Sequence, residues 1–225
     1  MVKIGQIGKG KFGKKILAKL NSIENTSIEW VCGSQDKWWI QNNVDWVIIA
    51  SPNEFHYEQV KYFLKKGINV FCEKPCTLCS NSLNELIKLS KQNSVKLYID
   101  DVYLYEDPII GNEFIYKKWG SSSGNIIDRM AYHHFYLLYD KNLSNTPFKI
   151  QVTKNKPNQK SFNLVFSNGN SYSFEYDFEW YKQKIHNISF QYSGDALERM
   201  LRYVFFSDSN FSNNHKRSIF ATKIS

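Results

Sequence analysis

Three glycines near the start of the chain follow one another at a spacing that suits the binding of phosphate groups. Gly8, Gly10 and Gly13 come after the apolar run Val2–Ile7 and lead into a helical pattern. In such a loop the first glycine turns the chain off the strand, the second admits a pyrophosphate to the backbone, and the third lets the helix pack on the sheet. The helix N-terminus then presents N–H groups to the phosphates. The motif predicts a dinucleotide site, and a tight turn without a ligand is the alternative.

Basic side chains crowd the same loop. Lys9 and Lys11 flank Gly10, Phe12 begins the apolar face of the helix, and Lys14 and Lys15 follow. The formal net charge is +8, but the other lysines are scattered and no known nucleic-acid motif is present. We therefore expect a polyanionic small molecule rather than a nucleic acid as the partner.

Strands and helices alternate up to about residue 100. One expected helix spans residues 54–66 and stops at Gly67, and another opens with the capping box Ser82-x-x-Glu85. This alternation predicts a parallel, doubly wound α/β sheet. The expected strands are Val2–Ile7, Ile28–Cys32, Val44–Ala50, Asn69–Cys72 and Lys96–Ile99.

The pattern of expected strands and helices changes after about residue 110. A helix is expected over residues 128–139 and another over 196–206, and Ser167-Asn-Gly-Asn170 is a hairpin signal. The second half thus predicts a small α+β domain with a mainly antiparallel open sheet. Its expected strands are Phe148–Thr153, Ser161–Phe166, Ser171–Phe178 and Ile185–Tyr192.

Composition indicates an ordinary globular protein. Apolar residues make up 42% of the chain, and no stretch is long and apolar enough for a membrane span. No signal segment precedes the first strand, so we expect no membrane association and a cytoplasmic location. The cysteines, Cys32, Cys72, Cys76 and Cys79, lack a second ligand pair at zinc spacing. We expect mostly buried free thiols and no metal.

A second signature begins at Val44. The run Val-Asp-Trp-Val-Ile-Ile-Ala-Ser-Pro-Asn-x-x-His is followed, after one helix, by Asn69-Val-Phe-Cys-Glu-Lys-Pro75. Together with the glycine loop it resembles the Gfo/Idh/MocA oxidoreductases, closely over residues 1 to about 108 and loosely beyond. The resemblance implies a Rossmann domain for NAD or NADP over residues 1–108. It also implies an α+β domain for substrate and subunit contacts over residues 109–225.

The resemblance assigns the central chemical role to Lys74, whose flanking Glu73 and Pro75 complete the motif. In the family this lysine reaches the nicotinamide ribose and the substrate hydroxyl, and a cis peptide often precedes the proline. A cation beside a reacting C–O group favours alkoxide character and can relay a proton. A surface lysine before a turn proline is the alternative.

The same resemblance extends the cofactor site along the third strand. Ala50, Ser51, Pro52 and Asn53 would lie at its carboxyl end, where open α/β sheets bind ligands. His56 follows at the family's spacing. It either contacts the cofactor or packs at the start of the helix.

A second catalytic group is expected near residue 130. The family places an aspartate four residues before a histidine, and a gapless match puts Asp128 and Tyr132 at these positions. A shift of one residue restores His133 but loses Asp128. We keep His133 and Tyr132 as alternatives, and packing within an aromatic cluster as a third.

Two departures from the family pattern matter. The second strand runs into Gly33 and Ser34 without the acidic residue that commonly holds the adenosine ribose, and Lys37 follows. This favours NADP over NAD as the cofactor. Only about a dozen residues separate Gly33 from Asp45, which makes the chain a shortened member.

We therefore expect hydride transfer between nicotinamide and a hydroxyl or keto carbon of a sugar, cyclitol or nucleotide-linked sugar. The alternative is a non-catalytic nucleotide-binding scaffold or regulator from the same family. Tyr172, Phe174, Tyr176 and Phe178 alternate along one strand and predict an exposed aromatic stripe. Because relatives pair through this sheet, we expect a homodimer. A stripe covered by the domain's own helix is the alternative.

Overall fold

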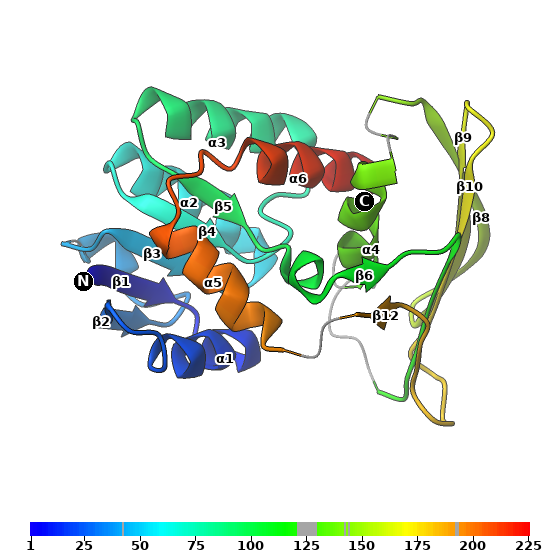
Figure 1. Ribbon diagram of the computed structural model, residues 1–225, viewed down its shortest axis with the longest axis horizontal. Helices are drawn as coiled ribbons and strands as arrows, with labels where there is room; N and C mark the ends of the chain where they lie inside the picture. The colour runs from blue at the N-terminus through cyan, green and yellow to red at the C-terminus, as the bar shows by residue number, and fades with distance from the viewer. Residues whose placement is uncertain (42, 121–129, 142, 144, 192–193) are drawn as a thin grey trace. The chain divides into compact units, whose positions relative to one another are not determined.

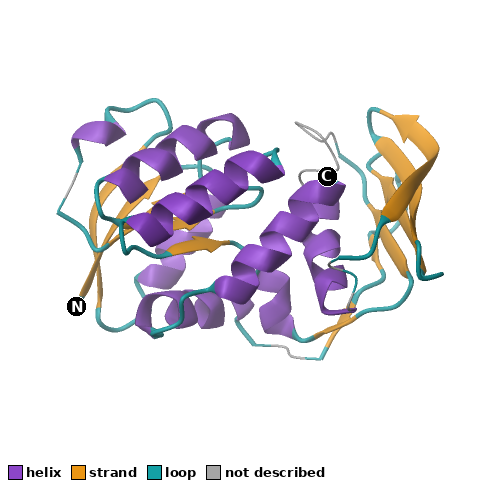
Figure 2. Cartoon of the chain, turned by 90° about the horizontal axis from the view of Figure 1, so that it is seen from above, coloured by secondary structure: helices purple, strands orange, loops and turns teal. Residues whose placement is uncertain are grey.

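The computed structural model describes residues 1–41, 43–120, 130–141, 143, 145–191 and 194–225. The chain divides into two compact units. The first unit comprises Met1–Tyr105 and Asp195–Lys223, and the second comprises Glu106–Gly194 and Ile224–Ser225. Both contain a sheet, and helices accompany each sheet (Figures 1 and 2).

The first unit is built on a five-stranded parallel sheet with the order β2-β1-β3-β4-β5. The chain leaves β1 toward one edge and then crosses to the other side for β3. The carboxyl ends of β1 and β3 therefore border a topological switch point, where open α/β sheets bind ligands. The strands confirm the expected doubly wound sheet; they are β1 (Val2–Ile7), β2 (Thr26–Cys32), β3 (Trp46–Ile49), β4 (Asn69–Cys72) and β5 (Leu97–Ile99).

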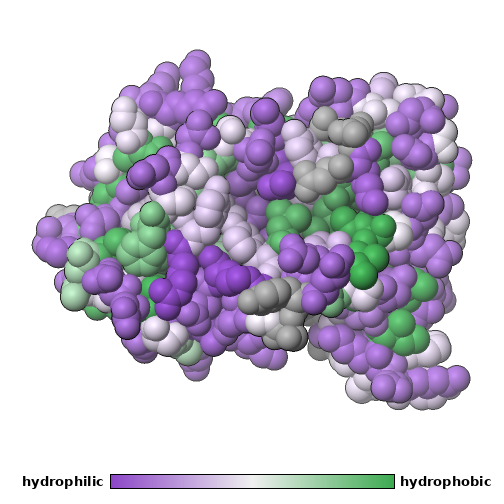
Figure 3. Space-filling model, in the orientation of Figure 1, coloured by the Kyte–Doolittle hydropathy of each residue, from purple (hydrophilic) through white to green (hydrophobic). Residues whose placement is uncertain are grey.

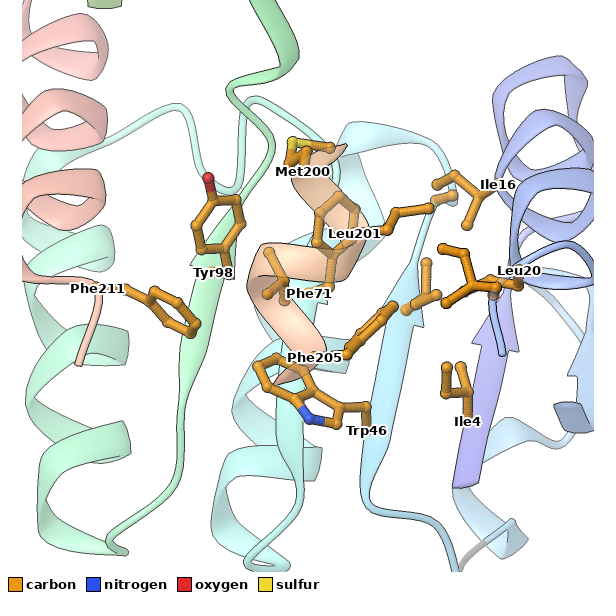
Figure 4. Close-up of a cluster of buried hydrophobic side chains, with 14 residues drawn as sticks. Ile4, Ile16, Leu20, Trp46, Phe71, Tyr98, Met200, Leu201, Phe205 and Phe211 are labelled. Carbon is orange, nitrogen blue, oxygen red and sulfur yellow. The ribbon is translucent and has the colours of Figure 1, made fainter. Parts of the chain in front are cut away.

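Helices cover both faces of this sheet (Figure 1). On one face α1 (Lys11–Leu20) and α5 (Ala196–Phe206) enclose a cluster that includes Ile4, Trp46 and Phe71 (Figure 4). On the other face α2 (Asn53–Lys65) and α3 (Ser80–Gln92) cover Val47, Ile49 and Val70. Burial on both faces explains why β3 reads as a continuous apolar run.

The last helices of the first unit correct the expected division after residue 108. Met200, Leu201, Val204 and Phe205 on α5 are buried in the same cluster as Ile4. This apolar face completes the N-terminal sheet, so the segment groups with the first unit although it comes last in sequence. A further helix, α6 (Ser212–Ile224), was not expected from the sequence.

The start of α3 also differs from the expectation. The helix begins at Ser80 with Cys79 as its N-cap, so Ser82 lies inside the first turn and forms no capping box. Glu85 instead accepts a hydrogen bond from Tyr57 Oη and pairs with Lys61 Nζ at 2.9 Å. Glu85 thus contacts the neighbouring helix α2 and takes no part in a cap.

The second unit contains a five-stranded sheet with the order β11-β7-β10-β9-β8. Only β7 and β10 run parallel; the other neighbours are antiparallel. The expected final strand divides into two short ones, and β12 pairs with β6 apart from the main sheet. The strands are β6 (Pro108–Ile109), β7 (Glu113–Lys117), β8 (Phe148–Lys156), β9 (Gln159–Phe166), β10 (Ser171–Asp177), β11 (Ile185–His186) and β12 (Ser189–Phe190).

The hairpin between β9 and β10 has the expected turn. Gly169 takes a positive φ of 90°, and Phe166 N donates to Asn170 O at 2.9 Å. The left-handed backbone at this position is the one that glycine adopts without strain. The Asn-Gly signal is therefore confirmed.

The aromatic stripe on β10 is buried, which overturns the expectation of an exposed face. Tyr172, Phe174, Tyr176 and Phe178 are at most 5% exposed. The helix α4 (Tyr132–Leu138) covers them: its Phe135 ring lies 5.4 Å from Phe174, centroid to centroid, and its His134 Nδ1 lies 2.7 Å from Tyr176 Oη. The domain's own helix is the covering layer, so this stripe gives no support to a homodimer.

Polar residues cover most of the molecular face in Figure 3, with smaller apolar patches between them. Across the described ranges, no helix has the length and apolar character needed to cross a membrane. Cys32, Cys72 and Cys76 are buried free thiols and Cys79 is an exposed one. Among the residues that the structure describes, no cluster of side chains is suited to hold a metal ion.

Candidate nucleotide and catalytic site

The glycine loop joins β1 to α1 and has the geometry that its sequence predicts. Gly8 adopts a φ of 110°, and a Cβ added there would overlap the carbonyl oxygen of Ala50. A Cβ added at Gly13 would overlap the carbonyl oxygen of Gly8. At Gly10, the N-cap of α1, an added Cβ would meet no atom within 4 Å. Gly8 and Gly13 thus serve the fold, whereas Gly10 leaves open space beside the backbone.

Gln6 supports this loop from below and was missed by the sequence analysis. Its fully buried side chain donates from Nε2 to Gly8 O at 2.8 Å and to Gly13 O at 3.1 Å. These bonds tie both ends of the loop to β1. A glutamine within an otherwise apolar buried strand was the only available signal.

The glycines predict two contrasting variants. Gly8→Ala should destabilise the fold by several kcal/mol, because the new Cβ overlaps backbone and the backbone is left-handed. Gly10→Ala should change stability by no more than about 0.5 kcal/mol yet weaken nucleotide binding at least about tenfold, since its Cβ fills space that a pyrophosphate needs. Chemical denaturation and binding of NADH check both. Unchanged binding by a folded Gly10→Ala protein would contradict the assigned cradle.

The loop after β2 contains a carboxylate that the sequence analysis treated as absent. Asp36 Oδ2 accepts a hydrogen bond from Gly33 N at 2.6 Å and forms an ion pair with Lys9 Nζ at 3.2 Å. The bond from Gly33 and the ammonium of Lys9 hold the pKa of Asp36 below its usual range. Gly8 N donates to Cys32 O at 2.8 Å, so this carboxylate stands beside the glycine loop. The expectation of NADP considered the end of β2 alone, and Asp36 places a carboxylate four residues beyond it.

Ser34 and Lys37 lie in the same loop. Lys37 precedes the short helix η1 (Trp38–Ile40), which takes the place of a longer connection to β3. Trp38 packs on Tyr62 and Phe63 of α2, with ring centroids 5.4 and 5.9 Å apart. Through these contacts the short segment around η1 packs against α2.

The end of β3 carries Ala50, Ser51, Pro52 and Asn53 as expected. Pro52 is the N-cap of α2 and Asn53 its first residue. The Ser51 hydroxyl is buried and donates to Gln59 Oε1 at 2.6 Å, so α2 fixes its direction. Ala50 borders the glycine loop, as the predicted overlap with an added Cβ at Gly8 indicates.

His56 is completely buried and bridges two loops of the site. Its Nε2 lies 2.8 Å from Ser51 O and its Nδ1 lies 2.8 Å from Pro75 O. Burial lowers the pKa of His56, and the bonds to Pro75 and Ser51 act in the opposite direction. The placement supports a packing role, in which this imidazole connects the ends of β3 and β4.

Glu73, Lys74 and Pro75 follow β4 directly. Glu73 N donates to Ile49 O at 2.8 Å, which continues the sheet by one step. The peptide between Lys74 and Pro75 is cis. Lys74 is 6% exposed, so its side chain is buried and is not that of a surface lysine.

The ends of β4 and β5 also bring together acidic residues that the sequence analysis did not select. Asp100 and Asp101 follow β5 and are 2% and 3% exposed. Asp101 accepts hydrogen bonds from Tyr98 Oη and from Asn214 Nδ2, the latter at 3.0 Å. Two adjacent aspartates after a buried strand were a usable signal, because carboxyl groups at a strand's carboxyl end are often functional.

The residues considered for a second catalytic position belong to the second unit, whereas Lys74 belongs to the first. Tyr132 is completely buried, and its ring centroid lies 6.3 Å from that of Tyr136. His133 is half-buried, and its Nδ1 lies 3.3 Å from Tyr136 Oη. Asp128 lies outside the described residues. The choice between Tyr132 and His133 stays a prediction.

These features fit a dinucleotide. The switch point, the open space at Gly10 and the lysine-rich N-terminus of α1 provide room and donors for a pyrophosphate. Asp36 adds a carboxylate beside the glycine loop, and Lys74 follows β4, the strand next but one to β1.

Comparison with known proteins agrees with this arrangement. Residues 24–100 match the Gfo/Idh/MocA family model, described as an oxidoreductase family with an NAD-binding Rossmann fold. An uncharacterized oxidoreductase of Streptococcus pneumoniae is 31% identical over 112 residues, which cover 42% of this chain and 30% of that protein. A 2,7-anhydro-N-acetylneuraminate hydratase of Mediterraneibacter gnavus is 32% identical over 97 residues, covering 41% and 26%.

Among solved structures, the fold resembles that of the WlbA dehydrogenase of Thermus thermophilus in complex with NAD and UDP-GlcNAcA. The TM-score is 0.75 at 15% identity, with 100% of this chain and 94% of that chain covered. The matched segment spans about a third or less of the length of the two sequence relatives. The glycine loop, the Glu73-Lys74-Pro75 corner and the match over residues 24–100 agree, so the N-terminal part of the chain is similar to the Gfo/Idh/MocA oxidoreductases.

Proposed function

We propose that this protein is a nicotinamide-dependent oxidoreductase acting on a hydroxyl or keto carbon of a sugar, cyclitol or nucleotide-linked sugar. The observation that carries the proposal is the pairing of an open cradle at Gly10 with a buried lysine, Lys74, at the carboxyl ends of one parallel sheet. A bound nicotinamide would supply or accept the hydride. The substrate class is taken from the relatives, including the structure with UDP-GlcNAcA.

The protein's own residues would bind the cofactor and exchange protons with the substrate. The α1 N-terminus and Gly10 would bind the pyrophosphate, and Lys74 would bind the reacting oxygen and exchange its proton. A cation beside that oxygen favours alkoxide character. Tyr132 or His133 would be the second proton-exchanging group, as the family resemblance suggests.

Binding of cofactor tests the proposal directly. Titration with NADH and NADPH should change the fluorescence of the reduced nicotinamide, and Gly10→Ala should abolish most of the change. No response to either nucleotide would refute the cofactor assignment. If binding occurs but no sugar or sugar nucleotide supports turnover, the non-catalytic scaffold is the better account.

Asp36 supports NAD rather than NADP as the cofactor. A carboxylate favours a ribose hydroxyl and repels a 2'-phosphate. We expect NADH to bind at least about tenfold more tightly than NADPH, and Asp36→Ala to reduce that ratio by about tenfold, because a hydrogen bond to a charged group contributes roughly 1.5–3 kcal/mol. Asp45→Ala is the matched control, since Asp45 accepts from Lys3 N where β3 begins. Tighter binding of NADPH by the unmodified protein would contradict this preference.

The assembly as a homodimer and the cytoplasmic location stay predictions. Light scattering over a dilution series tests the first: a mass near 26.5 kDa at micromolar concentration would exclude the dimer.

A further inference from the structure

Four ionisable residues follow the carboxyl ends of β4 and β5: Glu73, Lys74, Asp100 and Asp101. Lys74, Asp100 and Asp101 are each no more than 6% exposed. The proposed function uses the lysine and leaves the two aspartates without a role. Buried carboxyl groups beside a candidate catalytic lysine require an explanation, because an unbalanced buried charge is costly.

The sheet itself places Asp100 next to the lysine motif. The last register pair of β4 and β5 is Cys72 with Ile99. One step further, Asp100 N donates to Cys72 O at 2.9 Å, so Asp100 lies alongside Glu73 and immediately before the level of Lys74. Its carboxyl oxygen Oδ1 accepts a hydrogen bond from Val102 N at 3.0 Å, which fixes the side chain in the turn after β5.

Asp101 has a different environment, although it is the next residue. Its carboxylate accepts from Tyr98 Oη and from Asn214 Nδ2. Asn214 also accepts from Ile99 N at 3.0 Å and donates to Ile99 O at 2.7 Å. Asp101 therefore joins α6 to β5. Burial raises its pKa to about 6, and the hydrogen bonds from Tyr98 and Asn214 and the charge of Arg217 oppose the increase.

The pKa of Asp100 depends instead on the charges of the lysine motif. Burial raises the pKa of Asp100 to about 7, the charge of Glu73 adds to the increase, and the Val102 N–H and the Lys74 ammonium oppose it. Cys72 and Asp101 are the other titratable groups beside it. Among the groups that influence Asp100 most, Lys74 is the one cation.

We propose that Asp100 is a positioning residue for Lys74: when Asp100 is ionised, its carboxylate balances the buried ammonium, and its carboxyl group takes up a proton when that charge is lost. In the transfer an N–H bond at Lys74 Nζ breaks and an O–H bond at Asp100 forms, so an ion pair becomes a neutral pair. The total charge of this buried corner stays constant, which limits the desolvation cost of changing the state of Lys74. The inference rests on the proposed function only for the catalytic use of Lys74.

The test measures the titration of Lys74 without requiring turnover. Trace acetylation with acetic anhydride over a pH series, followed by mass spectrometry of the peptide that contains Lys74, reports its pKa. Asp100→Asn should lower that pKa by about one unit or more, because it removes the balancing negative charge. Asp101→Asn is the matched control: it removes an equally buried carboxylate from the neighbouring position and should leave the titration of Lys74 unchanged.

Asp100→Glu serves as the conservative rescue and should keep the Lys74 titration close to that of the unmodified protein. Circular dichroism and nucleotide binding establish that each variant is folded. Identical titration of Lys74 in folded Asp100→Asn and unmodified protein would overturn the proposal, as would an equal shift in Asp101→Asn. Loss of NADH binding in the unmodified protein would refute the proposed function instead, so the two failures are distinguishable.

Discussion

Replacing Lys74 by alanine is expected to reduce turnover by on the order of 10²-fold or more while leaving the dissociation constant for NADH within about threefold, because a positioned proton-exchanging group typically contributes 10²–10⁴-fold. The side chain is buried after β4, whereas the open cradle for the pyrophosphate is at Gly10 on another loop. Loss of the ammonium should therefore affect the reacting oxygen more than the cofactor. Steady-state kinetics and fluorescence titration measure the two quantities.

Lys74→Arg separates charge from proton exchange. Arginine keeps the positive charge but does not give up its proton near neutral pH, so its turnover should stay close to that of Lys74→Ala if proton exchange is the role. Recovery of most of the activity by Lys74→Arg would show that charge alone is needed. Equal losses in turnover and in NADH affinity would make Lys74 a cofactor ligand.

The sequence predicted the sheet of the first unit well because each element has a strong local signal. β1 and β4 have the expected bounds, and α5 begins and ends at the expected residues. The apolar run of β3 and the three glycines depend on contacts close in sequence, so their pattern is specific. The same locality explains the confirmed turn at Gly169.

Expectations failed where distant residues decide the outcome. Ser82 has no capping role because α3 begins at Ser80, and Glu85 contacts α2 instead. The β10 stripe is covered by α4 from another part of the chain. Asp36 is a different case: it lies four residues beyond the end of β2, and a local turn that bonds it to Gly33 N places its carboxylate beside Lys9. A motif search at fixed spacing does not detect such a residue.

The buried corner at Asp100 escaped the sequence for a related reason. The Asp-Asp pair after a buried strand was a signal of a site, but its burial depends on β4 on one side and on α6 from the end of the chain. The contribution of Asn214, which is far away in sequence, was unpredictable without the fold.

Burial of Asp100 has a measurable effect on stability. Its pKa in the folded protein is about 7, above the ordinary value of 3.8. The folded state therefore holds this proton more tightly than the unfolded chain does. The resulting stabilisation is complete below about pH 4 and is lost as the pH rises through 7, which corresponds to at most about 4 kcal/mol.

Asp100→Asn removes this dependence, because an amide stays neutral and its oxygen still accepts from Val102 N. Relative to the unmodified protein, the variant should gain between about 2 and 4 kcal/mol of unfolding free energy from pH 4.5 to pH 8.5. Urea denaturation at both pH values measures it. Asp101→Asn weakens the bonds to Tyr98 and Asn214. Because burial also raises the pKa of Asp101, to about 6, this variant should show a pH dependence of the same sign, centred at lower pH. A difference between Asp100→Asn and the unmodified protein that stays constant with pH would mean that Asp100 is ionised throughout, and that Lys74 or solvent stabilises its charge more than burial opposes it.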